Sequence, residues 1–117
     1  MNDVKRMRVS DALKAIETSN DGLYGVLLAR GTLEIGFYRP GETDLQQPHD
    51  QDEIYFIQSG EGFFECAGVS RPFEAGEALF VAAGVDHRFL DYSDDFTAWV
   101  VFYGPPGGEA EDEPPSA

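Results

Sequence analysis

Short runs rich in β-branched, aromatic and aliphatic residues follow one another between residues 23 and 103, and turn-forming residues separate them. The runs are LYGVLLAR, TLEIGFYR, EIYFIQ, GFFECAG, EALFVA, HRFLDY and FTAWVVFY. Strands this short and this closely spaced are typical of a β-sandwich or a β-barrel. Since no second long helical pattern accompanies them, the sequence predicts an all-β fold.

The two ends of the chain differ from this central region. Ser10 is the expected N-cap of a short helix that extends to about Thr18, and the turn at residues 20–22 ends it. After about Gly104 the sequence is dominated by Pro, Gly and Glu, which predicts a disordered acidic tail. We therefore expect an N-terminal segment with a short helix (residues 1–22), one barrel domain (residues 23–104) and a disordered acidic tail (residues 105–117).

The charge balance excludes several classes of partner. The formal net charge is -14, and the chain has only eight Lys and Arg residues. Binding to nucleic acid or to an anionic membrane surface needs clustered cations, so neither partner is expected. The single cysteine cannot form an internal disulfide, and no apolar run approaches the length that spans a bilayer. We expect a cytoplasmic protein whose partner is a small molecule.

The only two histidines, His49 and His87, lie in stretches that begin or end with glycine and contain other potential metal ligands. The first stretch reads GETDLQQPHDQDEIYFIQSG, and the second reads GEALFVAAGVDHRFLD. If the first stretch is extended, Gln47, His49 and Glu53 project to one face. Pro48 and the polar residues after His49 are also consistent with a bulge or corner, which would change that face assignment.

These two stretches resemble the signature motifs of the cupin family, and the resemblance covers roughly residues 23–103. It implies a cupin, or double-stranded β-helix (jelly-roll), barrel that holds one metal ion. The chain departs from the family pattern at Gln47, where the family has histidine, at Ala82, where it usually has proline, and at Asp91, where it has asparagine. Only the first departure affects a ligand.

The resemblance implies a metal site made of Gln47, His49, Glu53 and His87. Two imidazoles and one carboxylate match the arrangement that suits non-haem Fe(II) and leaves open coordination positions. Gln47 would be a weak fourth ligand or would bind a metal-bound water, which favours Fe or Mn; Ni, Zn and Cu stay open as the divalent transition metal. The alternative is a metal-free barrel, because glutamine replaces a histidine ligand.

Two further residues are candidates for binding a substrate. Tyr55 lies on the same alternate face as His49 and Glu53 and would give the pocket a polar tip. Arg39 ends a run that enters the first motif and would hold a carboxylate at the rim.

Three function classes remain: a dioxygenase-like metal enzyme, a metal-dependent isomerase or lyase, and a non-catalytic small-molecule or metal-binding protein. The ligand type favours the first. The many aromatic residues exceed what one small barrel buries, so we expect a homodimer.

Overall fold

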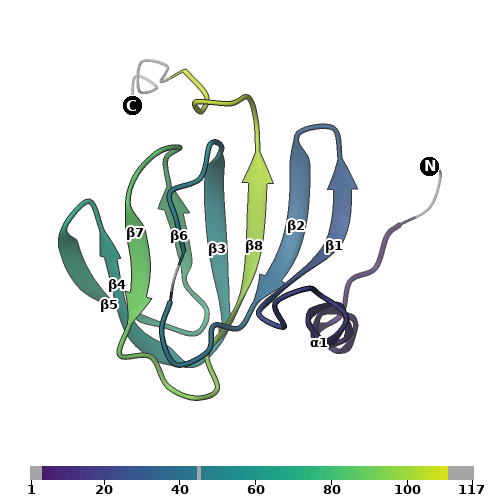
Figure 1. Cartoon of the computed structure of the whole chain (residues 1–117), viewed down its shortest axis with the longest axis horizontal. Helices are drawn as coiled ribbons and strands as arrows, with labels where there is room; N and C mark the ends of the chain where they lie inside the picture. Colours follow the sequence, from purple (N-terminus) through teal and green to yellow (C-terminus); the bar gives the residue numbers. More distant parts are fainter. Residues whose placement is uncertain (1–3, 45, 111–117) are drawn as a thin grey trace.

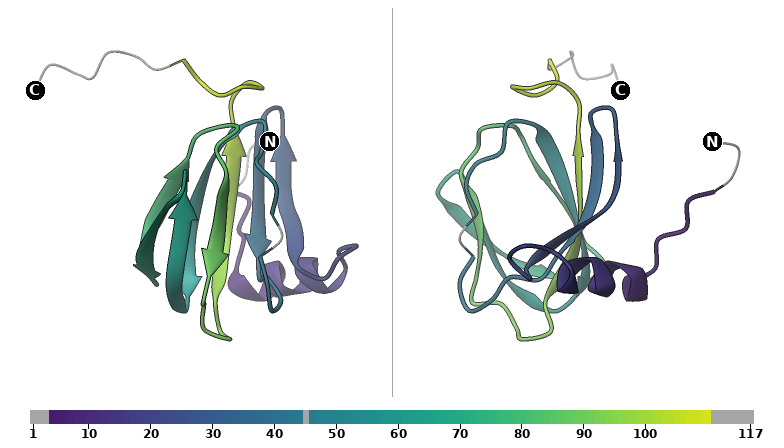
Figure 2. Two further views of the ribbon diagram at one scale, coloured as in Figure 1. Left: turned by 60° about the vertical axis from the view of Figure 1, so that its left-hand side comes forward. Right: turned by 45° about the vertical axis from the view of Figure 1, so that its right-hand side comes forward.

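The structure is a computed structural model that describes residues 4–44 and 46–110. It has two antiparallel sheets, with strand orders β1-β2-β8-β3-β6 and β5-β4-β7, that face each other as the walls of a barrel (Figures 1 and 2). The elements are α1 (Val9–Glu17), β1 (Tyr24–Arg30), β2 (Leu33–Tyr38), β3 (Asp52–Ser59), β4 (Glu61–Cys66), β5 (Val69–Glu74), β6 (Ala78–Val81), β7 (His87–Leu90) and β8 (Thr97–Tyr103). The all-β jelly-roll prediction is confirmed.

Strand alternation decides what the barrel encloses. Along β3, Glu53, Tyr55 and Ile57 are buried inside the barrel, whereas Phe56 faces outward and is exposed. Phe89 of β7 packs inside against an aromatic cluster made of Tyr55, Phe64, Phe73 and Phe96. These rings fill the middle of the barrel, so the polar residues that precede Tyr55 and Phe89 on the inner face lie at one end of it.

Strand β5 was not among the predicted runs. Its sequence, VSRPFE, has a single buried residue, Phe73, and contains Pro72. The strand lies at the edge of the three-stranded sheet and pairs only with β4, with Pro72 opposite Phe63. Proline has no backbone N–H, and at a sheet edge it is tolerated because no neighbouring strand is present to accept that hydrogen bond. With one buried apolar residue and a proline, this segment has too weak an apolar pattern to predict a strand.

Helix α1 begins one residue before Ser10, so the prediction that Ser10 is the N-cap is wrong. The Asp11 carboxylate accepts a hydrogen bond from the backbone N–H of Arg8 (2.9 Å), which fixes the earlier start. Ala12 and Ile16 are buried on Phe37, on the outer face of the five-stranded sheet. A Cβ atom at Gly25 would come within 2.4 Å of the Ala15 backbone, so this glycine permits the close approach of α1 to β1.

The chain continues past β8 across the end of the barrel at which β3 begins (Figure 1). There Gly107 N–H donates to the Asp50 carbonyl (2.7 Å), and Glu109 N–H donates to Asp52 Oδ2 (2.9 Å). The other oxygen of Asp52 accepts from Ala83 N–H (2.9 Å). These bonds place residues 105–110, which belong to the segment predicted to be disordered, against the barrel; residues 111–117 lie outside the described residues.

Replacing Asp52 with alanine is expected to release this C-terminal segment. The two N–H donors lower the pKa of Asp52 below its ordinary value of 3.8. A lowered pKa in the folded state contributes stability above pH 3.8 that is lost as the pH falls through the folded pKa. Hydrogen exchange at the Glu109 amide should therefore be fast in Asp52→Ala at neutral pH. In wild type this amide should be protected at neutral pH and lose its protection only in acid. Equal protection in both proteins at neutral pH would contradict this.

No helix among residues 4–44 and 46–110 combines the length and apolar character that crossing a bilayer requires.

Candidate metal centre

Three potential metal ligands meet inside the barrel at the end where β3 and β7 begin. Glu53 is the second residue of β3, His87 is the first of β7, and His49 lies in the loop before β3. His87 Nε2 is 2.9 Å from Glu53 Oε1, and His49 Nε2 is 3.8 Å from the same oxygen. One ligand atom from each residue lies within 4.8 Å of the others. The structure thus brings together three of the four residues predicted to bind metal.

The carboxylate of this cluster lacks a hydrogen-bond donor among the described residues. The Glu53 side chain is 1% exposed, and neither of its oxygens accepts a hydrogen bond of suitable geometry among the described residues. His87 Nδ1 lies 2.9 Å from the Val85 carbonyl, which can only accept, so Nδ1 carries the proton. In the neutral ring, Nε2 is then a lone pair that faces a carboxylate oxygen. Such a pair of acceptors needs a cation or a proton between them, so the residues fit a metal ion.

The environment of His87 shows the same demand for positive charge. Burial by itself would lower the pKa of His87, but the Glu53 carboxylate and the Val85 carbonyl outweigh burial and raise it above its ordinary value. His87 therefore keeps a proton to a higher pH than an ordinary histidine does. Metal binding competes with this proton and will weaken as the pH falls.

The glutamine that reaches the cluster is Gln46, and Gln47 is exposed. Gln46 Oε1 accepts from the Tyr55 hydroxyl (2.7 Å) and lies 3.4 Å from His49 Nε2. The placement of Gln47 on the face of His49 and Glu53 assumed an extended backbone, but β3 begins only at Asp52, and the preceding residues form a loop with bends at Asp50 and Gln51. Strand alternation therefore does not apply to Gln47, whose side chain is exposed.

Asp44 explains why Gln46 turns inward, and sequence reasoning missed it. Its buried carboxylate accepts from the Gln46 backbone N–H (3.1 Å) and from Gln46 Nε2 (2.9 Å). It also accepts from the Tyr38 hydroxyl (2.7 Å) and from Phe89 N–H (2.7 Å). Asp44 therefore joins the loop to β2 and β7. The available signal was an aspartate two residues before a polar residue, the pattern of an Asx turn.

Of the two residues predicted to bind a substrate, Tyr55 lies at the metal cluster and Arg39 does not. The Tyr55 ring is fully buried, and its hydroxyl lies 3.0 Å from His87 Nε2. Burial, followed by the Glu53 charge, raises the pKa of Tyr55 well above 10, so the phenol stays neutral. Tyr55 thus belongs to the cluster itself and does not line the pocket of about 370 Å³ that opens beside His49. Arg39 is exposed and lines neither that pocket nor the cluster.

A pocket of about 370 Å³ opens beside His49 and Gln46. Its other lining residues are Asp21, Leu23, Tyr24, Glu34, Tyr38, Val100 and Phe102. Tyr24 lies across Gly36, where a Cβ atom would come within 2.3 Å of the tyrosine ring, so this glycine allows the ring to form a wall of the pocket. The volume suits a small organic molecule next to the three ligands.

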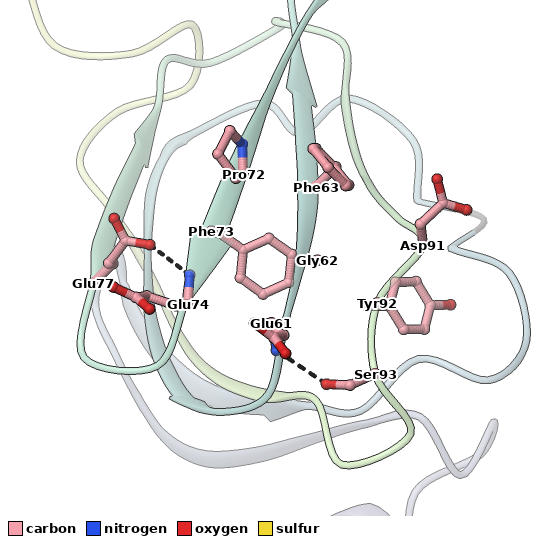
Figure 3. A pocket seen from close by; sticks show the side chains of 10 residues that line it. All are labelled: Glu61, Gly62, Phe63, Pro72, Phe73, Glu74, Glu77, Asp91, Tyr92 and Ser93. Atoms are coloured by element: carbon pink, nitrogen blue, oxygen red, sulfur yellow. Dashed lines mark hydrogen bonds between the residues drawn. The ribbon is translucent and has the colours of Figure 1, made fainter.

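A second concavity of about 640 Å³ lies at the three-stranded sheet and the segment after β7 (Figure 3). Glu61, Glu74, Glu77 and Asp91 surround apolar side chains there, including Phe63 and Phe73. None of the three metal ligands lines it. Chemistry at the cluster therefore belongs with the smaller pocket.

Comparisons with known proteins agree with the barrel fold described above. Residues 36–103 match the sequence model of the Cupin domain. An uncharacterised protein of Streptomyces coelicolor is 37% identical over 97 residues, which cover 81% of this chain and 92% of that protein. A Cupin 2 conserved barrel domain protein from Salinispora arenicola has a TM-score of 0.63 at 19% identity, covering 89% of this chain and 90% of the other. Protein NMB1881 from Neisseria meningitidis has a TM-score of 0.65 at 18% identity, covering 86% of this chain and 100% of the other.

Proposed function

The chain belongs to the cupin family, and from this premise we propose that it binds one divalent transition-metal ion and acts on a small organic molecule. The ligands are His49, Glu53 and His87. The observation that carries the proposal is the buried Glu53 carboxylate, which faces a histidine lone pair and has no hydrogen-bond donor of its own. A bound cation would satisfy both residues at once.

Within this function, we propose a dioxygenase-like activity with iron(II). Two histidines and one carboxylate are the donor set of non-haem iron oxygenases. When bound, the ion would supply open coordination positions for O2 and substrate. The protein's own contribution is to fix its ligands: the Val85 carbonyl orients the His87 ring, and the aromatic rings of Phe102 and Phe64 pack against His49 and His87. The adjoining pocket would hold the substrate beside His49.

Nitric oxide tests this proposal without a known substrate, because it binds open positions on iron(II) as O2 does. Anaerobic protein loaded with iron(II) should give a near-stoichiometric high-spin iron–nitrosyl EPR signal, and His87→Ala should give none. Wild type that takes up iron without this signal would contradict the oxygenase activity. Wild type that takes up no iron would contradict the proposed choice of metal.

A metal-dependent isomerase or lyase is the second candidate, and one observation favours it. This class needs a general base beside the metal, and Glu34 places a carboxylate in the pocket that adjoins His49. Turnover under argon with Mn(II), Ni(II) or Zn(II) would support this class over the oxygenase. Ligand-induced thermal stabilisation with no turnover under either condition would instead support a non-catalytic binding protein.

We also propose that the protein is cytoplasmic and that it binds neither nucleic acid nor a membrane. Its single cysteine, Cys66, is free, and its thiol pKa is raised by burial, so neither a disulfide nor a reactive thiolate is expected. The basic residues are few and are outnumbered by acidic ones, 8 against 22.

For the assembly, we propose a homodimer formed through the outer face of the five-stranded sheet. Helix α1 covers only the part of this face around Phe37. The strand register places further apolar side chains on the same face, and Phe56 and Phe80 are 45% and 57% exposed. The apolar face consists of Ile35, Ile54, Phe56, Phe80, Trp99 and Val101. Burying this face against a second copy would remove an exposed apolar patch from water.

Replacing Phe80 with aspartate is expected to convert the dimer to a monomer, because a charge on β6 would be buried within the apolar face. Light scattering measures the mass. Val69→Asp is the matched control: Val69 is 53% exposed but lies on β5 of the other sheet, so this variant should stay dimeric. A monomeric wild type, or dissociation by both variants alike, would contradict the assignment of the interface.

A further inference from the structure

The pocket beside the metal ligands is lined by acidic side chains and by neither lysine nor arginine. Glu34 and Asp21 line it, together with apolar and aromatic residues. The eight basic residues of the chain are all described by the structure, and none lines this pocket. They are Lys5, Arg6, Arg8, Lys14, Arg30, Arg39, Arg71 and Arg88. The fixed charge that a ligand meets in this pocket is therefore negative.

Glu34 is the carboxylate that points into the barrel from β2. Its register partner on β8 is Phe102, which lies opposite Glu53 on the inner face. The Tyr24 hydroxyl donates to Glu34 Oε2 (2.8 Å), which holds the carboxylate in place. Burial and the bond to Glu34 raise the pKa of Tyr24 far above 10, so this hydroxyl remains a donor. One such bond leaves most of the acceptor capacity of the carboxylate for a ligand.

Asp21 contributes charge from a different position. Its carboxylate accepts from the backbone N–H groups of Leu23 (2.8 Å) and Tyr24 (3.2 Å), and these bonds lower its pKa. Asp21 is thus an anion that shapes the turn before β1 at the edge of the pocket. It adds negative potential where a ligand would enter.

The remaining walls suit an apolar body that carries a positive charge. Tyr24 and Phe102 meet edge to face with ring centroids 6.4 Å apart, and Leu23 and Val100 complete the apolar lining. Aromatic faces near a carboxylate are the surroundings in which proteins bind organic ammonium groups. An anionic ligand would instead meet two carboxylates with no lysine or arginine to offset them. A metal ion paired with Glu53 would leave a net positive charge, but Glu34 already offsets it.

We propose that this pocket selects a small organic cation, an amine or ammonium compound with an apolar group, whose nitrogen pairs with Glu34. The inference rests on the proposed function in that it treats the pocket as the substrate site of the metal centre. It narrows the substrate class to cationic molecules and excludes carboxylates of similar size.

Three probes with the same ring and different charge test the selectivity: benzylamine, benzyl alcohol and benzoate. Calorimetric titrations of the full chain, metal-free and loaded with Mn(II), should give the tightest binding for benzylamine. Glu34→Gln keeps an acceptor for Tyr24 and should weaken benzylamine binding by about tenfold or more, with little effect on benzyl alcohol. Glu61→Gln removes an exposed carboxylate outside this pocket and should change neither affinity.

Benzoate binding as tight as benzylamine binding in wild type would overturn the proposal, and so would the failure of all three probes to bind. This comparison uses wild type alone and therefore stands even if Glu34→Gln is poorly folded. Metal content measured on the same samples separates this inference from the proposed function. Protein that takes up no metal yet prefers benzylamine refutes the proposed function alone, whereas metal-loaded protein that prefers benzoate refutes the selectivity alone.

Discussion

Replacing Glu53 with glutamine is expected to weaken the binding of a divalent ion by at least about a hundredfold, since even residues that only orient ligands change affinity by up to that factor. Glutamine keeps the shape of the side chain but removes the anionic ligand that lies within 4 Å of both histidines. Competition with a chromophoric chelator measures the affinity for Mn(II) and Zn(II). Glu65→Gln, which changes a partly exposed glutamate on the outer face of β4, should leave both affinities unchanged.

At a pH at which His87 is neutral, the same substitution is expected not to lower the free energy of unfolding of the metal-free protein. Under that condition no described residue donates a hydrogen bond of suitable geometry to the buried Glu53 carboxylate, so its removal loses no such bond. His87 can release its proton and need not remain as an unpaired buried charge. Unchanged metal affinity in Glu53→Gln would contradict the assignment of the ligand, and strong destabilisation would contradict the view that the metal, and not the fold, requires this carboxylate.

Replacing Asp44 with asparagine is expected to lower the free energy of unfolding by about 2–4 kcal/mol. The buried carboxylate is the acceptor in each of its hydrogen bonds, and an asparagine side chain offers only one acceptor oxygen. An asparagine amide would place an NH2 group against one of those donors, such as Phe89 N–H, and leave it unsatisfied. Urea denaturation measures the change. Gln46 would also lose its anchor, so we expect weaker metal binding as a second effect.

Asp94→Asn is the matched control for this prediction. Asp94 is exposed in the turn before β8, so its substitution should change the free energy of unfolding by no more than about 0.5 kcal/mol. An equally small change for Asp44→Asn would show that the carboxylate does not organise the loop around Gln46.

The regular strands explain why part of the site could be predicted from the sequence. Alternation placed Glu53 and Tyr55 on one face, and the structure has both buried inside the barrel on β3. Alternation does not extend to Gln47, where the chain is a loop. In this loop it is the neighbouring Gln46 whose side chain is directed by hydrogen bonds to Asp44. Periodicity is informative only where the backbone is regular.

The remaining features depend on contacts between residues far apart in the sequence. Asp44 bonds to Phe89, 45 residues away, and Glu34 acquires its place in the pocket through Tyr24 and Phe102. No local pattern reports such contacts. Gly36 did carry a usable signal, because a glycine in the middle of a strand often marks the close approach of another group, here the Tyr24 ring.

The most direct test of the metal centre is the metal content of protein purified without a chelator or a histidine tag. Elemental mass spectrometry of wild type, His49→Ala and His87→Ala should give near-stoichiometric transition metal in wild type and a loss of it in both variants. The element found would then direct the assays, with iron favouring oxygen-dependent chemistry. Wild type that is empty and takes up no Fe(II), Mn(II), Ni(II) or Zn(II) would contradict the metal centre and favour a metal-free binding barrel.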